Sequence, residues 1–157
     1  MNKIKTPSFL IILIFLIYSC GFSPQYAGFK NLEFDLIVDK VSGDRDFNNE
    51  IKSQIKRYDR GRVDVEKIRI SYDSDYEKII LTKNTKGEAT KYNLKVNVMF
   101  DISSENYSTK IVFNDEFSID KIDDTIEENN YIKIVKRNFA ERAIEKIILN
   151  IRQNKWL

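Results

Sequence analysis

The sequence contains no histidine and only one cysteine, Cys20, among its 157 residues. Without an imidazole, no Ser-His-Asp or Cys-His nucleophile can be activated. A zinc site is equally disfavoured, because such sites take three or four ligands drawn mainly from His and Cys. A single cysteine also allows no internal disulfide. We therefore expect a protein that is not an enzyme and that holds no metal or other cofactor.

Glycine and proline are also scarce, with 5 and 2 residues, whereas 42% of the residues are hydrophobic and 32% are charged. A disordered chain would have fewer apolar residues, and a low-complexity chain would have far more Gly and Pro. The length suits one compact domain, whose core can use 10 Phe and 8 Tyr.

Residues 1–19 have the pattern of a lipoprotein signal peptide. Lys3 and Lys5 precede an apolar run from Phe9 to Ile17, which is too short to span a bilayer, where about 20 residues are needed. The run leads through Tyr18 and Ser19 directly to Cys20, whose thiol would receive a diacylglycerol and whose new amino group would receive a further acyl chain, as palmitate in many lipoproteins. An uncleaved signal anchor with an incidental thiol is the alternative.

The residue after the cysteine is Gly21 rather than Asp, which favours sorting to the outer membrane on its periplasmic side. Removal of residues 1–19 would take away Lys3 and Lys5 and no acid, and so would leave 24 basic and 24 acidic residues. A chain with no net positive charge is a poor candidate for binding nucleic acid.

The mature chain divides into a short tether and one domain. Residues 20–28 include Pro24 and show no regular hydrophobic period, so we expect a lipidated tether. Periodic sequence starts at Phe29, and residues 29–157 are expected to form the domain.

Two amphipathic helices and several strands are predicted in this domain. Apolar residues spaced by three or four predict a helix over 47–58 and a second from Thr125 to 150–153, where Thr125 and Glu128 have capping-box spacing. Alternating apolar residues predict strands over 29–38, 63–72, 92–102 and 107–119, the last interrupted at Asp115, while 76–81 either extends the second strand or starts another. The order β-α-β-β-β-α predicts an α+β fold, a two-layer sandwich with two helices packed on one face of a four-stranded sheet.

Acidic clusters are expected to have structural roles. Asp73-Ser74-Asp75 lacks the other ligands of a calcium loop, so a solvated turn is expected there. The five acids between Asp120 and Glu128 are explained by capping of the second helix rather than by a cation.

Basic residues are dense in two places. Residues 52–69 contain seven, most of which are expected on a solvated helix face and the loop after it. Residues 83–88 are expected to form a hairpin turn, with Asn84 and Gly87 as carriers of positive φ. Lys83 and Lys86 on that tip could bind an anionic headgroup, or could only keep the turn soluble.

Three stretches resemble the LPS-assembly lipoprotein LptE family, particularly its alphaproteobacterial branch. Residues 20–26, CGFSPQY, look like the CGFxPxY opening of that family, and residues 87–96, GEATKYNLKV, look like its G-x-A-T-x-Y-x-L-x-V strand entry. Tyr131 and residues 140–143, AERA, are similar to its closing helix.

The resemblance implies a function that periodicity cannot give. Members of the LptE family are outer-membrane lipoproteins of lipopolysaccharide transport, which act as plug and assembly partner of the LptD barrel and bind lipopolysaccharide. In enterobacterial members an arginine near this hairpin tip contributes to lipopolysaccharide binding. That position holds Thr85 here, between Lys83 and Lys86, and a second basic position falls near Glu128.

Two other functions remain open. One is a membrane-tethered hydrolase that uses carboxylates alone, since 24 acids offer many pairs although no spacing singles one out. The other is a structural lipoprotein that binds a different envelope component.

Overall fold

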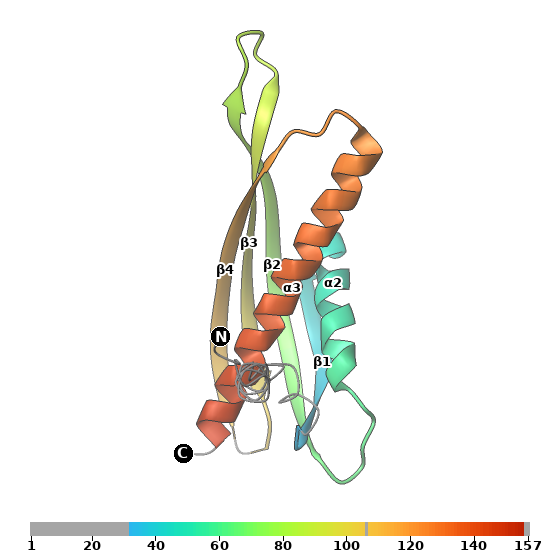
Figure 1. Cartoon of the computed structure of the whole chain (residues 1–157). Coiled ribbons are helices and arrows are strands. Elements are labelled where there is room, and N and C mark those ends of the chain that lie inside the picture. The colour runs from blue at the N-terminus through green and yellow to red at the C-terminus, as the bar shows by residue number, and fades with distance from the viewer. Residues whose placement is uncertain (1–31, 106, 156–157) are drawn as a thin grey trace, which may run out of the picture. The chain divides into compact units, whose positions relative to one another are not determined.

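A computed structural model describes residues 32–105 and 107–155 of the chain. Its elements follow in the order β1 (Phe34–Gly43), α2 (Arg45–Ile55), a 3-10 turn η2 (Lys56–Tyr58), β2 (Glu66–Lys83), β3 (Ala89–Ser103), β4 (Ser108–Asp120) and α3 (Thr125–Lys155). The residues from Glu33 onward form one compact unit (Figure 1). No helix of the described residues is long and apolar enough to cross a membrane.

The four strands form one mixed sheet in the order β1-β2-β3-β4. β1 runs parallel to β2, with Leu36 opposite Ile68, whereas β2 with β3 and β3 with β4 are antiparallel. The α2 helix supplies the crossover that parallel pairing of β1 with β2 requires. Period-two alternation directs the apolar side chains of the strands to one face, which we call the inner face.

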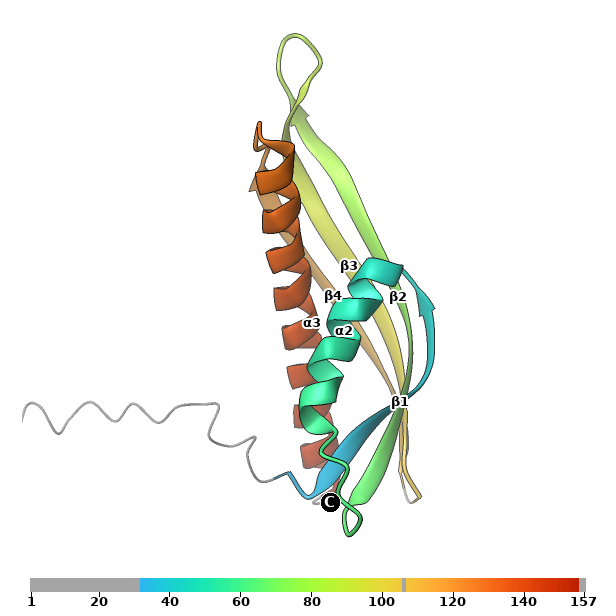
Figure 2. The same cartoon turned by 90° about the vertical axis from the view of Figure 1, so that its right-hand side faces the viewer.

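Both helices cover the inner face, as Figure 2 shows. In α2 the residues Phe47, Ile51 and Ile55 recur every four positions and are buried. In α3 the buried stripe extends along the helix from Val135 to Ile151. The predicted α+β sandwich and its element order are therefore confirmed.

Three local predictions are wrong. Asp73-Ser74-Asp75 forms no turn, because β2 continues through it and Ser74 is buried, donating to the Asn48 side-chain oxygen at 2.8 Å. Val63 does not belong to β2, which starts at Glu66; it is 88% exposed in the preceding loop. Asp115 does not interrupt β4.

Asp115 stays in the strand because it has a partner on α3. Its side chain is directed to the inner face, where Arg142 donates through Nε at 2.7 Å and lies at 2.6 Å through Nη2. A charge-assisted pair of this kind satisfies a carboxylate at a position where the alternation would place an apolar side chain.

The capping residues also differ from the prediction at α3. Asp124, not Thr125, caps the helix, because its Oδ1 accepts from the backbone N–H of Ile126 at 2.8 Å and of Glu127 at 3.0 Å. At α2 the cap is Asp44, whose carboxylate accepts from Phe47 N–H at 2.7 Å. Both caps follow the usual preference of helix N-termini for Asp.

The predicted boundaries after residues 19 and 28, together with Cys20 and the signal segment, lie outside the described residues. They stay predictions.

Candidate functional site

The β2–β3 hairpin extends past the N-terminal end of α3, so its tip is not covered by either helix (Figure 1). Lys83 pairs with Ala89 at the end of the ladder, and residues 84–88 make the turn. The hairpin is long because β2 and β3 are the two longest of the four described strands, with 18 and 15 residues, and residues 76–81 extend β2 rather than start another strand.

Asn84 organises the tip through its side chain. Its Oδ1 accepts from the N–H groups of Lys86 and Glu88, each at 2.9 Å, and its Nδ2 donates to the Glu88 carboxylate at 2.8 Å. Gly87 has φ +84° as expected, but Asn84 does not have a positive φ. Asn84 therefore serves as the acceptor of an Asx turn rather than as a left-handed residue.

The predicted ligand residues are brought together at this tip. Lys83, Thr85 and Lys86 are all exposed, and neither lysine forms an ion pair within the described part of the chain. The next lysine, Lys91, is different, because its Nζ lies 3.4 Å from the Asp120 carboxylate. The two free positive charges of the hairpin are thus concentrated in its last few residues.

At the root of the hairpin lies a charged contact that the sequence did not reveal. The Lys78 ammonium donates to the Glu128 carboxylate at 2.5 Å and lies 3.9 Å from the centre of the Tyr92 ring. Glu128 also accepts from the N–H of Ile122 at 3.3 Å. The hydrogen bond from Lys78 lowers the pKa of Glu128 below its usual value, although burial opposes this shift.

Glu128 was the position where the resemblance placed a second basic residue. A lysine from another element, Lys78 on β2, is nevertheless present there, but its charge is paired with the Glu128 carboxylate. Lys78 and Glu128 are 50 positions apart, so no local pattern could have paired them.

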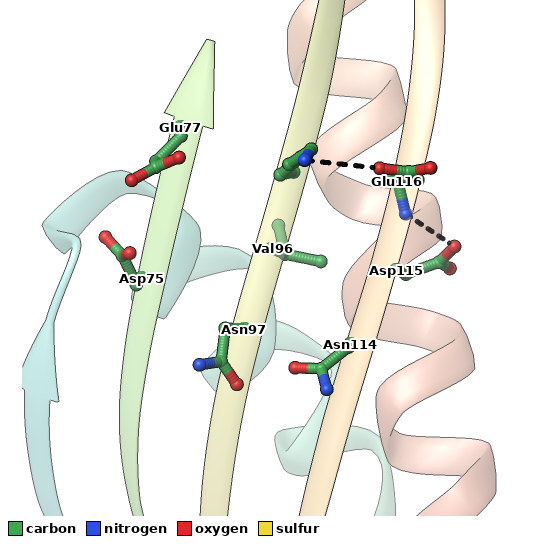
Figure 3. Close-up of a pocket in the computed structure, with 8 residues that line it drawn as sticks. Asp75, Glu77, Val96, Asn97, Asn114, Asp115 and Glu116 are labelled. Carbon is green, nitrogen blue, oxygen red and sulfur yellow. Dashed lines mark hydrogen bonds and ion pairs between the residues drawn. The ribbon is translucent and has the colours of Figure 1, made fainter. Parts of the chain in front are cut away.

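A second candidate region is a hollow of about 400 Å³ on the outer face of the sheet, the face opposite the helices. Figure 3 shows Asp75 and Glu77 on β2, Asn97 on β3, and Asn114 and Glu116 on β4. Lys95 lies 3.6 Å from Glu116 across β3 and β4. The region is therefore polar, with carboxylates from two strands around one lysine.

This hollow does not have the environment of a carboxylate-based hydrolase. A carboxylic acid that donates a proton near neutral pH is usually kept in an apolar, dry pocket. Asp75, Glu77 and Glu116 are instead all exposed to solvent. The hollow can accept polar or basic groups, and it offers no dry site for a proton donor.

No known protein-family model matches the sequence, and no protein of curated function matches it. Among solved structures, the chain is similar to rare lipoprotein B from Shewanella oneidensis, with a TM-score of 0.52 and 13% identity over 76% of this chain and 99% of that one. It is also similar to a putative lipoprotein from Caulobacter crescentus, with a TM-score of 0.47 and 12% identity over 76% and 87% of the two chains. A minor lipoprotein from Acinetobacter baumannii gives a TM-score of 0.42 and 16% identity over 71% of this chain and 93% of that one.

Identities this low show a shared fold and nothing finer. The chain has the fold of rare lipoprotein B over nearly the whole of that protein. The three structures named above are described as lipoproteins, which is a statement about those proteins.

Proposed function

We propose that the mature chain is a lipid-anchored outer-membrane lipoprotein of the LptE type. In this role it takes part in lipopolysaccharide transport, as plug and assembly partner of the LptD barrel, and catalyses no reaction. The observation that carries the proposal is the position of the GEATKYNLKV motif, which opens β3 at the tip of a hairpin in a rare lipoprotein B fold. The motif is a feature of the sequence, and the fold likeness is a feature of the whole backbone, so they support the proposal at two different levels.

The outer face of the sheet supports the barrel partnership. It presents acids, amides and lysines over most of its length, with Met99 and Val112 as a half-exposed apolar pair. The interior of an outer-membrane barrel is polar and often water-filled, so a polar sheet face can lie against it without a cost for burying charge in lipid. A face made to pack against another protein core would be more apolar.

The hairpin tip supports the binding of lipopolysaccharide. The inner region of this lipid carries phosphates and acidic sugars, to which lysine ammonium groups donate charge-assisted hydrogen bonds. Lys83 and Lys86 can both approach one such group, because their turn is fixed by Asn84 and projects beyond the helices. Thr85 between them adds a hydroxyl that can donate or accept.

Titration of purified lipopolysaccharide into the mature protein tests the ligand site. Each exposed contact of this kind is worth about two- to fivefold in affinity, so the double variant Lys83→Glu, Lys86→Glu should bind about tenfold more weakly or worse. The matched control is Lys52→Glu, Lys56→Glu, which makes the same charge change on exposed residues of α2 and η2. Equal affinities of wild type and tip variant, with both folded, would assign the lysines to solubility.

Affinity purification of the lipidated protein from outer membranes tests the partnership. A stoichiometric large barrel protein should accompany it. A hydrolase or a structural lipoprotein that binds another envelope component would appear without such a barrel, and that result would contradict the proposal.

A further inference from the structure

Three large apolar side chains are exposed next to one another on the projecting part of the hairpin. Ile79, Ile80 and Leu81 of β2 are 38%, 48% and 47% exposed, and we call them the apolar belt. Elsewhere in the part of the chain that the structure describes, no two exposed large apolar residues are adjacent in sequence. A run of this kind is unfavourable in water unless a partner covers it, so the belt indicates a binding surface.

The belt lies beyond the cover of the helices. Lys78, one position before it, still reaches Glu128 in the first turn of α3, and the hairpin continues past the end of that helix (Figure 2). β1 ends opposite Ser74, so the rest of β2 has no neighbouring strand on that side among the described residues. Alternation along the strand places Ile79 and Ile80 on opposite faces of the sheet, and both are accessible from this free edge.

A β-bulge interrupts the strand within the belt. The register between β2 and β3 shifts between Ile80 and Thr82, so Leu81 has no partner residue on β3. Bulges re-aim side chains and are frequent next to functional sites. Lys78 and Lys83 flank the belt along the same free edge, and lysines and bulges both hinder the addition of a further strand. A strand from another protein is therefore a poor occupant of this edge.

Polarity changes stepwise from the hairpin tip to the belt. Lys83 and Lys86 are exposed at the tip, and next to them Thr82 and Thr90 hydrogen-bond to each other through their hydroxyl groups at 2.7 Å. The belt follows, with Ile80 three positions before Lys83, or about 10 Å along a strand. Ammonium groups, then hydroxyl groups, then an apolar surface match the order of phosphate, sugar and hydrocarbon in an anionic glycolipid.

We propose that the apolar belt binds a hydrocarbon chain of the anionic lipid whose phosphates Lys83 and Lys86 bind. This inference rests on the proposed binding of lipopolysaccharide at the hairpin tip, and it adds the acyl chains of that lipid as a second contact. The interior of an outer-membrane barrel is polar, so a hydrocarbon chain held there needs an apolar surface beside it. Each methylene group that the belt removes from water contributes about fourfold to the affinity.

Two ligands that differ only in their acyl chains test the contact. One is purified rough-type lipopolysaccharide, kept below its critical aggregation concentration. The other is the same material after alkaline removal of the acyl chains, which keeps its sugars and phosphates. Each is titrated into the mature chain with Cys20→Ser, because this protein carries no acyl chains of its own and needs no detergent. It should bind the intact lipid about tenfold more tightly or better.

A variant of the belt locates the contact. Ile80→Thr with Leu81→Thr removes most of the apolar surface and keeps a residue type that favours strands. It should weaken binding of the intact lipid by about tenfold and leave binding of the deacylated ligand unchanged. Met99→Thr with Val112→Thr is the matched control, because these residues are 52% and 50% exposed on the outer face of the same sheet, and it should change neither affinity.

The outcomes separate the belt from the tip. If the protein with an intact belt binds neither ligand, the proposed lipopolysaccharide site is refuted and the belt contact with it. If it binds the deacylated ligand at least as tightly as the intact lipid, the belt contact alone is overturned. The same holds if the belt variant keeps the preference for the intact lipid, and loss of a co-purifying barrel from that variant would then assign the belt to the barrel.

Two checks complete the experiment. Lys83→Glu with Lys86→Glu should weaken both ligands alike, because both carry the phosphates. Circular dichroism establishes that the variants are folded. The comparison of the two ligands on the protein with an intact belt depends on no belt variant, so equal affinities there overturn the proposal by themselves.

Discussion

The ion pair between Asp35 and Arg62 allows a sharp test of what holds the loop of residues 59–65 against β1. Asp35 is only 1% exposed, and its carboxylate accepts three hydrogen bonds from Arg62, at 2.9 Å from the backbone N–H, 3.0 Å from Nε and 2.7 Å from Nη2. Arg62→Met would remove the guanidinium while keeping most of the aliphatic stem.

The magnitude follows from the burial of the charge left behind. Removing one partner of a fully buried ion pair costs about 3–5 kcal/mol, because the remaining charge is uncompensated. The Arg62 side chain is 32% exposed, so water can replace part of it, and its backbone N–H would still donate. We therefore expect Arg62→Met to lose about 2–3 kcal/mol of unfolding free energy near neutral pH.

The pH dependence provides an independent readout. Burial acts to raise the pKa of Asp35, but the hydrogen bonds and the charge of Arg62 outweigh it and hold this pKa below its usual value. The native pair thus adds stability that is present above the ordinary Asp pKa of about 3.9 and is lost as the pH falls through the lowered folded value. In Arg62→Met burial dominates, so the pKa of Asp35 should rise, and the deficit against wild type should shrink as the pH falls from about 7 to about 5.

Urea unfolding of both proteins at these two pH values measures the effect. Lys67→Met is the control, since it removes an exposed cation from the same end of the sheet and should leave the free energy nearly unchanged. A loss below about 1 kcal/mol for Arg62→Met, with the same deficit at both pH values, would refute the reasoning.

Three further predictions concern other parts of the chain. Gly43→Ala should lose at least about 2 kcal/mol in thermal unfolding, because Gly43 has φ +95° and a Cβ there would overlap the Ser74 carbonyl oxygen; an unchanged melting temperature would contradict this. In cells that lack the barrel, the Cys20→Ala protein should no longer be found in the outer-membrane fraction, whereas its presence there at the normal amount would exclude lipidation as the anchor. Lys78→Met should cost about 1–2 kcal/mol and reduce the part of the acid sensitivity, below about pH 4.3, that the lowered pKa of Glu128 causes; identical acid unfolding curves would argue against this contact.

The fold was predictable because its elements have strong local periods. The strand from Tyr92 to Ile102 alternates without a break, and every apolar residue in it from Leu94 on is buried except Met99, which lies on the outer face. The apolar stripe of α3 likewise indicates which side of that helix is buried. Periodicity of this kind reports burial of apolar side chains on one face, and that burial is the main driving force of folding.

Polar residues with distant partners were not predictable. Ser74 looked like part of a solvated turn, but its hydroxyl donates to Asn48, 26 positions away, and the pair is buried. Asp115 looked like a break in a strand, but Arg142 neutralises it from α3. A buried polar group costs little once it is paired, and a single sequence does not show the partner.

A single sequence does not show which distant residues meet in the fold, and this also limits what the family resemblance implies about the candidate ligand site. The two positions where bases were implied hold Thr85 and Glu128, which alone would indicate that the charge has been lost. In three dimensions Lys83 and Lys86 flank Thr85 in one short turn, and Lys78 binds Glu128 from the neighbouring strand. Lysine acts on phosphate as a point charge on a flexible stem, so its exact position along the chain matters less than for a bidentate arginine. The tip pair remains free, whereas the charge of Lys78 is compensated by Glu128, and binding of an anionic lipid is therefore expected to depend on Lys83 and Lys86 far more than on Lys78.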